Sequence, residues 1–157
     1  KEVLSAKLRL TITDNGNNWG TGRTVDVHRL ITNWEEGNGT ENDRGTGSGA
    51  TWNCSIDSII ANQAKNCNGA TEWEMGKPNE PEQHPWIETP SATQTITNNQ
   101  TGVVEYDVTG DVQSFLSGTN NNYGWIIKKT NEGQNGRIEF GTKESASVPQ
   151  LVVTYQP

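Results

Sequence analysis

The side chains best suited to binding chemistry in this sequence are its tryptophans. The chain has six Trp against only two Phe. An indole ring can stack on the apolar face of a sugar while polar neighbours bind the hydroxyl groups. The alternative is that a tryptophan packs in a core or anchors a loop.

The position of each tryptophan in the sequence indicates which of these two alternatives is favoured. Core packing is favoured for Trp125, which lies in a strand-like run beside Ile127, and loop anchoring for Trp34 and Trp52, which border Gly-rich segments. Both alternatives stay open for the remaining candidates, which lie in polar segments or just before a glycine. These are Trp19, Trp73, Trp86 and Tyr123.

Basic side chains form a second candidate surface. A cluster of them could hold an acidic polymer through charge-assisted hydrogen bonds. The candidates are Arg23, Arg29, Lys128, Lys129, Arg137 and Lys143. Lys128 and Arg137 would be neighbours if their two strands pair as a hairpin, but scattered, solvated charges are the favoured alternative.

Acidic side chains in Asn- and Gly-rich turns suggest Ca²⁺ as a possible ligand, because this ion needs several oxygen atoms that converge on one point. The candidate ligands are Asp14, Asp43, Asp107 and Asp111. The sequence contains no D-x-D-x-D-G-type loop, and Asp107 is also explained as a turn acceptor at a strand end.

Catalytic motifs are missing from the sequence. The two histidines, His28 and His84, lie far apart, and no G-x-S-x-G, H-E-x-x-H or P-loop pattern occurs. A pair of carboxylates for glycoside hydrolysis depends on spatial separation, which sequence does not give. We therefore expect a protein that is not an enzyme.

The composition is that of a polar, acidic chain. Its 157 residues suit one domain, 1–157, and the formal net charge is −7 with 30% hydrophobic residues. The charge disfavours nucleic acid, whose phosphates need Lys and Arg, and it also disfavours anionic membrane surfaces. No run of eighteen apolar residues occurs, so we expect no membrane span.

Two cysteines, Cys54 and Cys67, leave two alternatives: one disulfide or two free thiols. Their spacing does not match a structural zinc site. We favour the disulfide, which would stabilise the long loop between them by about 3 kcal/mol in the loop-entropy model and implies an oxidising compartment.

Alternating apolar residues predict an all-β domain. The clearest alternation runs from Leu8 through Leu10 to Ile12, and it recurs in several later segments. The expected strands are 4–12, 24–30, 93–97, 103–108, 125–129, 137–140 and 151–155, the pair 125–129 and 137–140 forming a hairpin.

One short helix is expected after the fourth of these strands. Thr109 is a suitable N-cap, Asp111 suits the first turn, and Gly118 ends the helix. Val112, Phe115 and Leu116 would form its apolar stripe. A second short helix at 56–63 is a further expectation, inside long irregular segments at 35–50 and 51–92 that suggest functional loops.

Several segments resemble one known family from end to end. They are "SAKLRL", "VDVHRLITNWEEGNGT", "GATWN", "VEYDVTGDVQSFLSG", "GWIIKKTNEG" and "RIEFGTKES…PQLVVTY". Together they resemble the DNRLRE or disaggregatase-related domain family, which is grouped with carbohydrate-binding module family 96. The resemblance implies an antiparallel jelly-roll β-sandwich, secretion or cell-surface attachment, and polysaccharide binding. Some relatives bind acidic polysaccharides such as alginate. The resemblance also makes calcium plausible.

The chain departs from that family at its start. Family members carry earlier strands before the equivalent of "SAKLRL", the point at which this sequence begins. We therefore expect either a trimmed chain or a partner strand that completes the sandwich, since an open sheet edge accepts strands. The alternative function is accordingly a structural subunit of an extracellular filament, sheath or matrix that self-associates by strand complementation.

Overall fold

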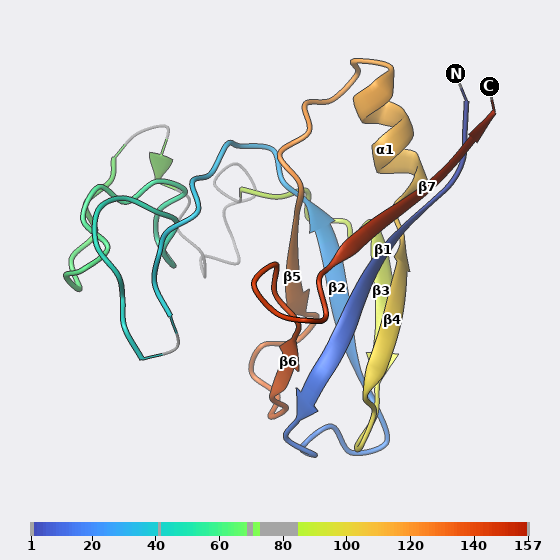
Figure 1. Ribbon diagram of the computed structural model, residues 1–157, viewed down its shortest axis with the longest axis horizontal. Coiled ribbons are helices and arrows are strands. Elements are labelled where there is room, and N and C mark those ends of the chain that lie inside the picture. Colours follow the sequence, from blue (N-terminus) through green and yellow to red (C-terminus); the bar gives the residue numbers. More distant parts are fainter. Residues whose placement is uncertain (1, 41, 69–70, 73–84, 157) are drawn as a thin grey trace. The chain divides into compact units, whose positions relative to one another are not determined.

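The computed structural model describes residues 2–40, 42–68, 71–72 and 85–156. They form two compact units (Figure 1). The sandwich unit comprises residues 1–29, 89–121 and 125–157, and the loop unit comprises residues 30–88 and 122–124. The expectation of one domain over 1–157 stays a prediction, and each unit is described by itself.

The first sheet of the sandwich unit is built around one long strand, β1 (Glu2–Asn15). On one side it pairs with β4 (Gly102–Asp107), and it also pairs with β6 (Ile138–Phe140) and β7 (Gln150–Gln156). All pairings are antiparallel. β7 follows the first half of β1 and β6 follows its last residues, so both run beside the same long strand (Figure 1).

The second sheet has the order β3–β2–β5, from β3 (Ala92–Ile96) through β2 (Arg23–Arg29) to β5 (Trp125–Lys129). The predicted hairpin between 125–129 and 137–140 is wrong, because β5 pairs with β2 whereas β6 pairs with β1 in the other sheet. Only a tight turn forces two successive strands to pair. The connection over residues 130–137 is long enough to pass from one sheet to the other.

The apolar faces of both sheets bury the core. Leu10 and Ile12 of β1 face the same side as Val104 and Tyr106 of β4, and all four are buried. The second sheet contributes a matching set of buried residues, Val25, Val27 and Ile96. The alternation seen in sequence therefore predicts the correct inward faces, and the all-β antiparallel sandwich is confirmed.

One helix, α1 (Thr109–Leu116), follows β4. The residue at the N-cap position is Val108, so the prediction of Thr109 as the cap is wrong by one residue. The Thr109 hydroxyl instead accepts a hydrogen bond from the Ala6 amide at 2.9 Å, which ties the helix to β1. Asp111 lies in the first turn as predicted.

The apolar stripe of α1 is narrower than predicted. Val112 is buried and Phe115 packs at 5.7 Å between ring centroids from Trp125, but Leu116 is exposed. The chain leaves the helix at Gly118, whose φ of 73° is the left-handed conformation that glycine adopts without strain. No helix in the described part of the chain has the length and apolar character needed to cross a membrane.

Candidate functional site

The described part of the loop unit contains no named strand or helix. Its backbone is held by isolated bridges, which join Thr40 to Asp43, Gly49 to Asp57, Cys54 to Glu72 and Leu30 to Trp86. The predicted helix at 56–63 is wrong. Asp57, inside that segment, exchanges backbone hydrogen bonds with Gly49 at 2.8 and 3.0 Å, and this pairing requires an extended rather than a helical backbone.

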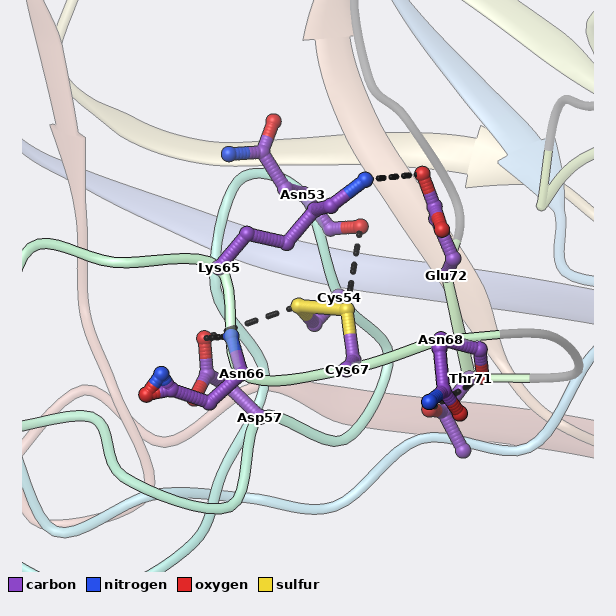
Figure 2. Close-up of polar contacts among 9 residues, drawn as sticks. All are labelled: Asn53, Cys54, Asp57, Lys65, Asn66, Cys67, Asn68, Thr71 and Glu72. Carbon is purple, nitrogen blue, oxygen red and sulfur yellow. Dashed lines mark hydrogen bonds and ion pairs between the residues drawn. A yellow bond between two sulfur atoms is a disulfide. The ribbon is translucent and has the colours of Figure 1, made fainter.

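The disulfide between Cys54 and Cys67 is confirmed, with Cα atoms 5.9 Å apart. Cys54 is completely buried, so the bridge fastens the 54–67 segment to the interior of the loop unit. An ion pair between Lys65 and Glu72 lies beside it (Figure 2). Cross-linking of this kind stabilises a segment that has little apolar surface to bury.

The Asp57 carboxylate, 2% exposed, is the polar centre of the loop unit. One oxygen accepts a hydrogen bond from the Ile59 amide at 3.0 Å, and the other accepts bonds from the Asn66 amide at 3.3 Å and the Thr51 hydroxyl at 3.4 Å. Figure 2 shows this carboxylate between Asn66 and the disulfide. A buried carboxylate is tolerated when its lone pairs are satisfied in this way.

Two glycines explain why this loop is Gly-rich. A Cβ atom on Gly49 would lie 2.5 Å from the Gly37 Cα, so the two backbones approach more closely than any side chain allows. Gly45 has a φ of 77°, and a Cβ there would lie 2.1 Å from the Asn38 side-chain oxygen. Glycine at these positions lets the loop fold back on itself and shape a hollow.

The hollow has a volume of about 420 Å³, within the range of small-molecule sites. Trp52, which is 56% exposed, is one of the lining residues. Arg44 is the cation of the described lining, and its Nη1 donates to the carbonyl of Asn62, a second lining residue, at 3.2 Å. The wall also contains the polar side chains of Thr51, Asn53, Asp57, Asn62 and Gln63 and the apolar side chains of Ala50, Ile60 and Ala64.

This set of groups suits a sugar. An exposed indole offers an apolar face for stacking, and side-chain amides both donate to and accept from hydroxyl groups. A guanidinium adds a paired donor for a carboxylate. Among the described candidate tryptophans, Trp52 lines this hollow, although the sequence favours loop anchoring for it.

The other predicted aromatic residues lie elsewhere. Trp34 is 42% exposed, and its Nε1 donates to the carbonyl of half-buried Tyr123 at 2.9 Å, so both anchor the loop unit. Trp86 is buried beside Leu30, to which its backbone pairs. Trp73 lies outside the described residues.

Trp19 belongs to the core of the sandwich unit. It is fully buried, and its Nε1 donates to the Arg137 carbonyl at 3.0 Å. Gly136 passes so close that a Cβ atom there would lie 3.2 Å from the indole ring. Trp19 therefore has no exposed ring face for a ligand.

The predicted basic residues do not form one cluster. Arg137 makes ion pairs with Asp14, at 2.5 Å, and with Glu139. Lys128 lies opposite Asp26 in the second sheet, and the half-buried Arg23 begins the same strand as Asp26. Because Lys128 and Arg137 belong to different sheets, the reason for expecting them side by side is gone.

The four predicted metal ligands each have protein partners. Asp14 pairs with Arg137, Asp43 accepts from the Gly45 amide at 2.9 Å, and Asp111 accepts from the Trp125 Nε1 and the Ser91 hydroxyl, both at 2.6 Å. Hydrogen bonds from the Lys7 ammonium and from Thr109 hold the pKa of Asp107 well below its usual range.

Within the described residues, no group of three or more His, Cys, Asp or Glu side chains converges as a metal site requires. Calcium binding stays a prediction, since backbone and amide oxygens also bind this ion, and no step of the binding chemistry is assigned to a metal.

Sequence analysis missed the polar residues of the hollow, which are Arg44, Thr51, Asn53, Asp57, Asn62 and Gln63. One signal could have found three of them, because Asp57, Asn62 and Gln63 lie between the two cysteines of the favoured disulfide. Arg44 lies in the Gly-rich segment before Trp52, but only the fold-back at Gly45 and Gly49 brings it to that ring's hollow.

The sandwich fold and an open hollow with an exposed tryptophan define a binding module of the β-sandwich class. The family model of carbohydrate-binding module family 96 matches residues 70–155, and the chain belongs to this family. No curated protein and no solved structure shows a significant match to the chain. The matched segment contains β3, β4, α1, β5, β6 and most of β7, whereas the hollow is lined by residues from 37 to 64.

Proposed function

We propose that the chain binds a polysaccharide in the hollow of the loop unit and does not cleave it. Family membership supports carbohydrate as the class of ligand. The observation that carries the location is Trp52, an exposed tryptophan in the lining of a hollow that also contains amides, a hydroxyl, a guanidinium, the Asp57 carboxylate and apolar side chains. The proposal assigns no general acid or general base to the chain.

In the proposed complex, the apolar group of the hollow stacks on the sugar ring and the polar groups form hydrogen bonds with it. A pyranose ring covers the Trp52 indole, and the amides of Asn53 and Gln63 bind its hydroxyl groups. Arg44 favours a sugar that carries a carboxylate, because a guanidinium binds that group in a bidentate manner. A uronate-containing polymer is therefore the preferred ligand over a neutral one.

The location proposed for the protein is outside the cell, secreted or at a cell surface. The support is the Cys54–Cys67 disulfide, since such bonds persist in oxidising compartments. Polysaccharides are also abundant there, which places the module beside its ligand.

Affinity electrophoresis through gels that contain acidic or neutral polysaccharides tests the proposal. We expect the chain to be retarded most by a uronate polymer, and Trp52→Ala to lose most of that retardation because the stacking surface is gone. Trp52→Phe keeps a flat ring and should retain part of it. The matched control is Ile59→Ala, which removes an equally exposed apolar side chain of the same unit that does not line the hollow.

Arg44→Gln separates the ligand class from the site. It should lower the retardation by acidic polymers more than that by neutral polymers, because it removes the carboxylate contact in addition to the hydrogen bond to the Asn62 carbonyl. Equal retardation of the wild type, Trp52→Ala and Ile59→Ala by every polymer would contradict the proposed site. No retardation of the wild type by any polymer would contradict the proposed function.

A further inference from the structure

The sandwich unit has a hollow of its own, on the outer face of its first sheet. Its volume is about 380 Å³, within the range of small-molecule sites. Arg9 and Thr11 of β1 flank the buried Leu10, so their side chains face away from the core. Gln150 of β7 pairs with Arg9, and Val103 of β4 pairs with Thr11. Three neighbouring strands therefore contribute side chains to this hollow.

The loop between β6 and β7 forms a wall of the hollow beside β1 (Figure 1). The amide of Gly141, the first residue of this loop, donates to the Thr11 carbonyl at 2.9 Å. A Cβ atom on Gly141 would lie 2.2 Å from the Ser147 carbonyl oxygen, so the loop returns more closely than a side chain allows. The Ser147 amide also donates to the Ser145 hydroxyl at 3.1 Å. These contacts hold Ser147 and the adjacent Val148 beside the sheet, where both line the hollow.

The polar side chains of this hollow have hydrogen-bonding capacity that the described part of the protein does not use. Among the described residues, neither the half-buried hydroxyls of Thr11 and Ser147 nor the amide of Gln150 has a hydrogen-bond partner. The Arg9 guanidinium donates through Nε to the Glu105 carboxylate. Hydroxyls and amides both donate and accept hydrogen bonds, which matches the hydroxyl groups of a sugar.

The charge and the apolar groups of the hollow favour a neutral sugar. The ion pair between Arg9 and Glu105 balances the positive charge of the lining, and a ligand carboxylate would be repelled by Glu105. Val103 is 63% exposed and Val148 is 48% exposed, so both offer apolar surface to the C–H groups of a sugar ring. This hollow therefore differs from that of the loop unit, where a guanidinium favours a carboxylate.

The family match supports carbohydrate as the class of ligand here. The matched residues, 70–155, include Val103 and the lining residues at 146–148 and 150. The described lining of the hollow in the loop unit, from 37 to 64, lies before the matched segment. The hollow of the sandwich unit is thus partly built from the segment that the chain shares with a carbohydrate-binding family.

We propose that the hollow on the outer face of the first sheet binds a neutral polysaccharide, as a second carbohydrate site of this chain. Val103 and Val148 contact the ring of one sugar, and Thr11, Ser147 and Gln150 bind its hydroxyl groups. Family membership supports both this site and the function proposed above, but the two sites use different residues and different sugars. Either can therefore fail without the other.

Affinity electrophoresis through gels that contain hydroxyethylcellulose, xyloglucan or galactomannan tests the proposal, with alginate as the acidic polymer. The wild type should be retarded by at least one neutral polymer. The double variant Val148→Ala with Gln150→Ala should raise the dissociation constant for that polymer at least about fivefold, because a hydrogen bond and an apolar contact are lost. Its retardation by alginate should not change. Both residues are exposed, so the fold should tolerate their truncation.

The matched control is Val152→Ala with Gln156→Ala. It makes the same two changes at exposed positions of β7 that do not line the hollow, and it should bind the neutral polymer like the wild type. Trp52→Ala should also bind that polymer like the wild type, because Trp52 lines the hollow of the loop unit.

Hydrogen exchange on the wild-type chain provides a second readout that needs no variant to fold. A saturating oligosaccharide of the retarding neutral polymer should slow exchange within residues 142–149 and leave residues 44–64 unchanged. Absence of retardation by all the neutral polymers would overturn this second site, as would equal dissociation constants for the two double variants. Retardation by a neutral polymer that Trp52→Ala abolishes would also overturn it, but would leave the function proposed above intact.

Discussion

The two units of this chain are stabilised by different physical means. In the sandwich unit, strand ladders and one cluster of buried apolar side chains, including Leu10, Ile12 and Tyr106, hold the fold. In the loop unit, the described buried apolar residues are few: Leu30, Cys54, Ile60 and Trp86. A disulfide and the hydrogen-bonded Asp57 take the place of a core there.

This contrast explains where a binding surface can arise. A residue packed in a core has its apolar face buried, as Trp19 shows, and has no exposed surface for a ligand to contact. A loop fixed by covalent and polar contacts can leave Trp52 and Arg44 at the surface and still hold them in place. Function on well-anchored loops above a rigid scaffold is a general pattern.

The largest expected effect is on the sandwich unit. Ile12→Ala should lower the free energy of unfolding by about 3–4 kcal/mol, because Ile12 is 2% exposed and the substitution leaves a cavity. Leu116→Ala is the control, since Leu116 is exposed and its loss should change stability by under about 0.5 kcal/mol. Urea unfolding followed by far-ultraviolet circular dichroism measures both. Equal losses would mean that the core is not where the structure places it.

The next effect belongs to the loop unit. Replacing both cysteines, Cys54→Ala with Cys67→Ala, removes a cross-link that stabilises its segment by about 3 kcal/mol. We expect amide exchange to accelerate within residues 44–68 and polysaccharide retardation to fall, while exchange in β1 and β4 stays slow. Rapid exchange in both units would show that the two are not independently stabilised, and the comparison would fail.

The smallest effect sharpens the description of the core. The Tyr106 hydroxyl is buried and has no hydrogen-bond partner among the described residues. An unsatisfied buried hydroxyl is costly, so Tyr106→Phe should raise the free energy of unfolding at pH 7 by up to about 1 kcal/mol. A loss of more than this amount would reveal a partner of the hydroxyl.

The same residue predicts a pH dependence. Burial, with a smaller contribution from Asp26, raises the pKa of Tyr106 above its usual value. The unfolded chain then loses the tyrosine proton first as pH rises, so the wild type should lose stability above about pH 10. Tyr106→Phe should lose less over the same range in urea titrations, and identical slopes would contradict the buried position.

The local sequence pattern predicted the sandwich unit well because apolar and polar residues alternate along its strands. The inward faces of Leu10, Ile12 and Val104 follow from a period of two, which the sheet itself imposes. The pairing of the strands could not be predicted from this pattern. The connection between β5 and β6 is long enough either for a hairpin or for a passage from one sheet to the other. That choice depends on contacts far apart in sequence.

The loop unit was predictable only in part. The disulfide followed from two cysteines with no metal-site spacing. The hollow could not be predicted from the two cysteines. Arg44 and Trp52 both line it because Gly37 approaches Gly49 closely and Asp57 pairs with Gly49. These two contacts have no local sequence pattern.

Hydrogen exchange of the chain with and without a saturating uronate oligosaccharide tests the central claim most directly. Our account predicts slower exchange in the segments around Arg44, Trp52 and Gln63, and unchanged exchange in β1, β4 and β7. Protection confined to the strands of the sandwich unit, with the loop segments unchanged, would contradict it.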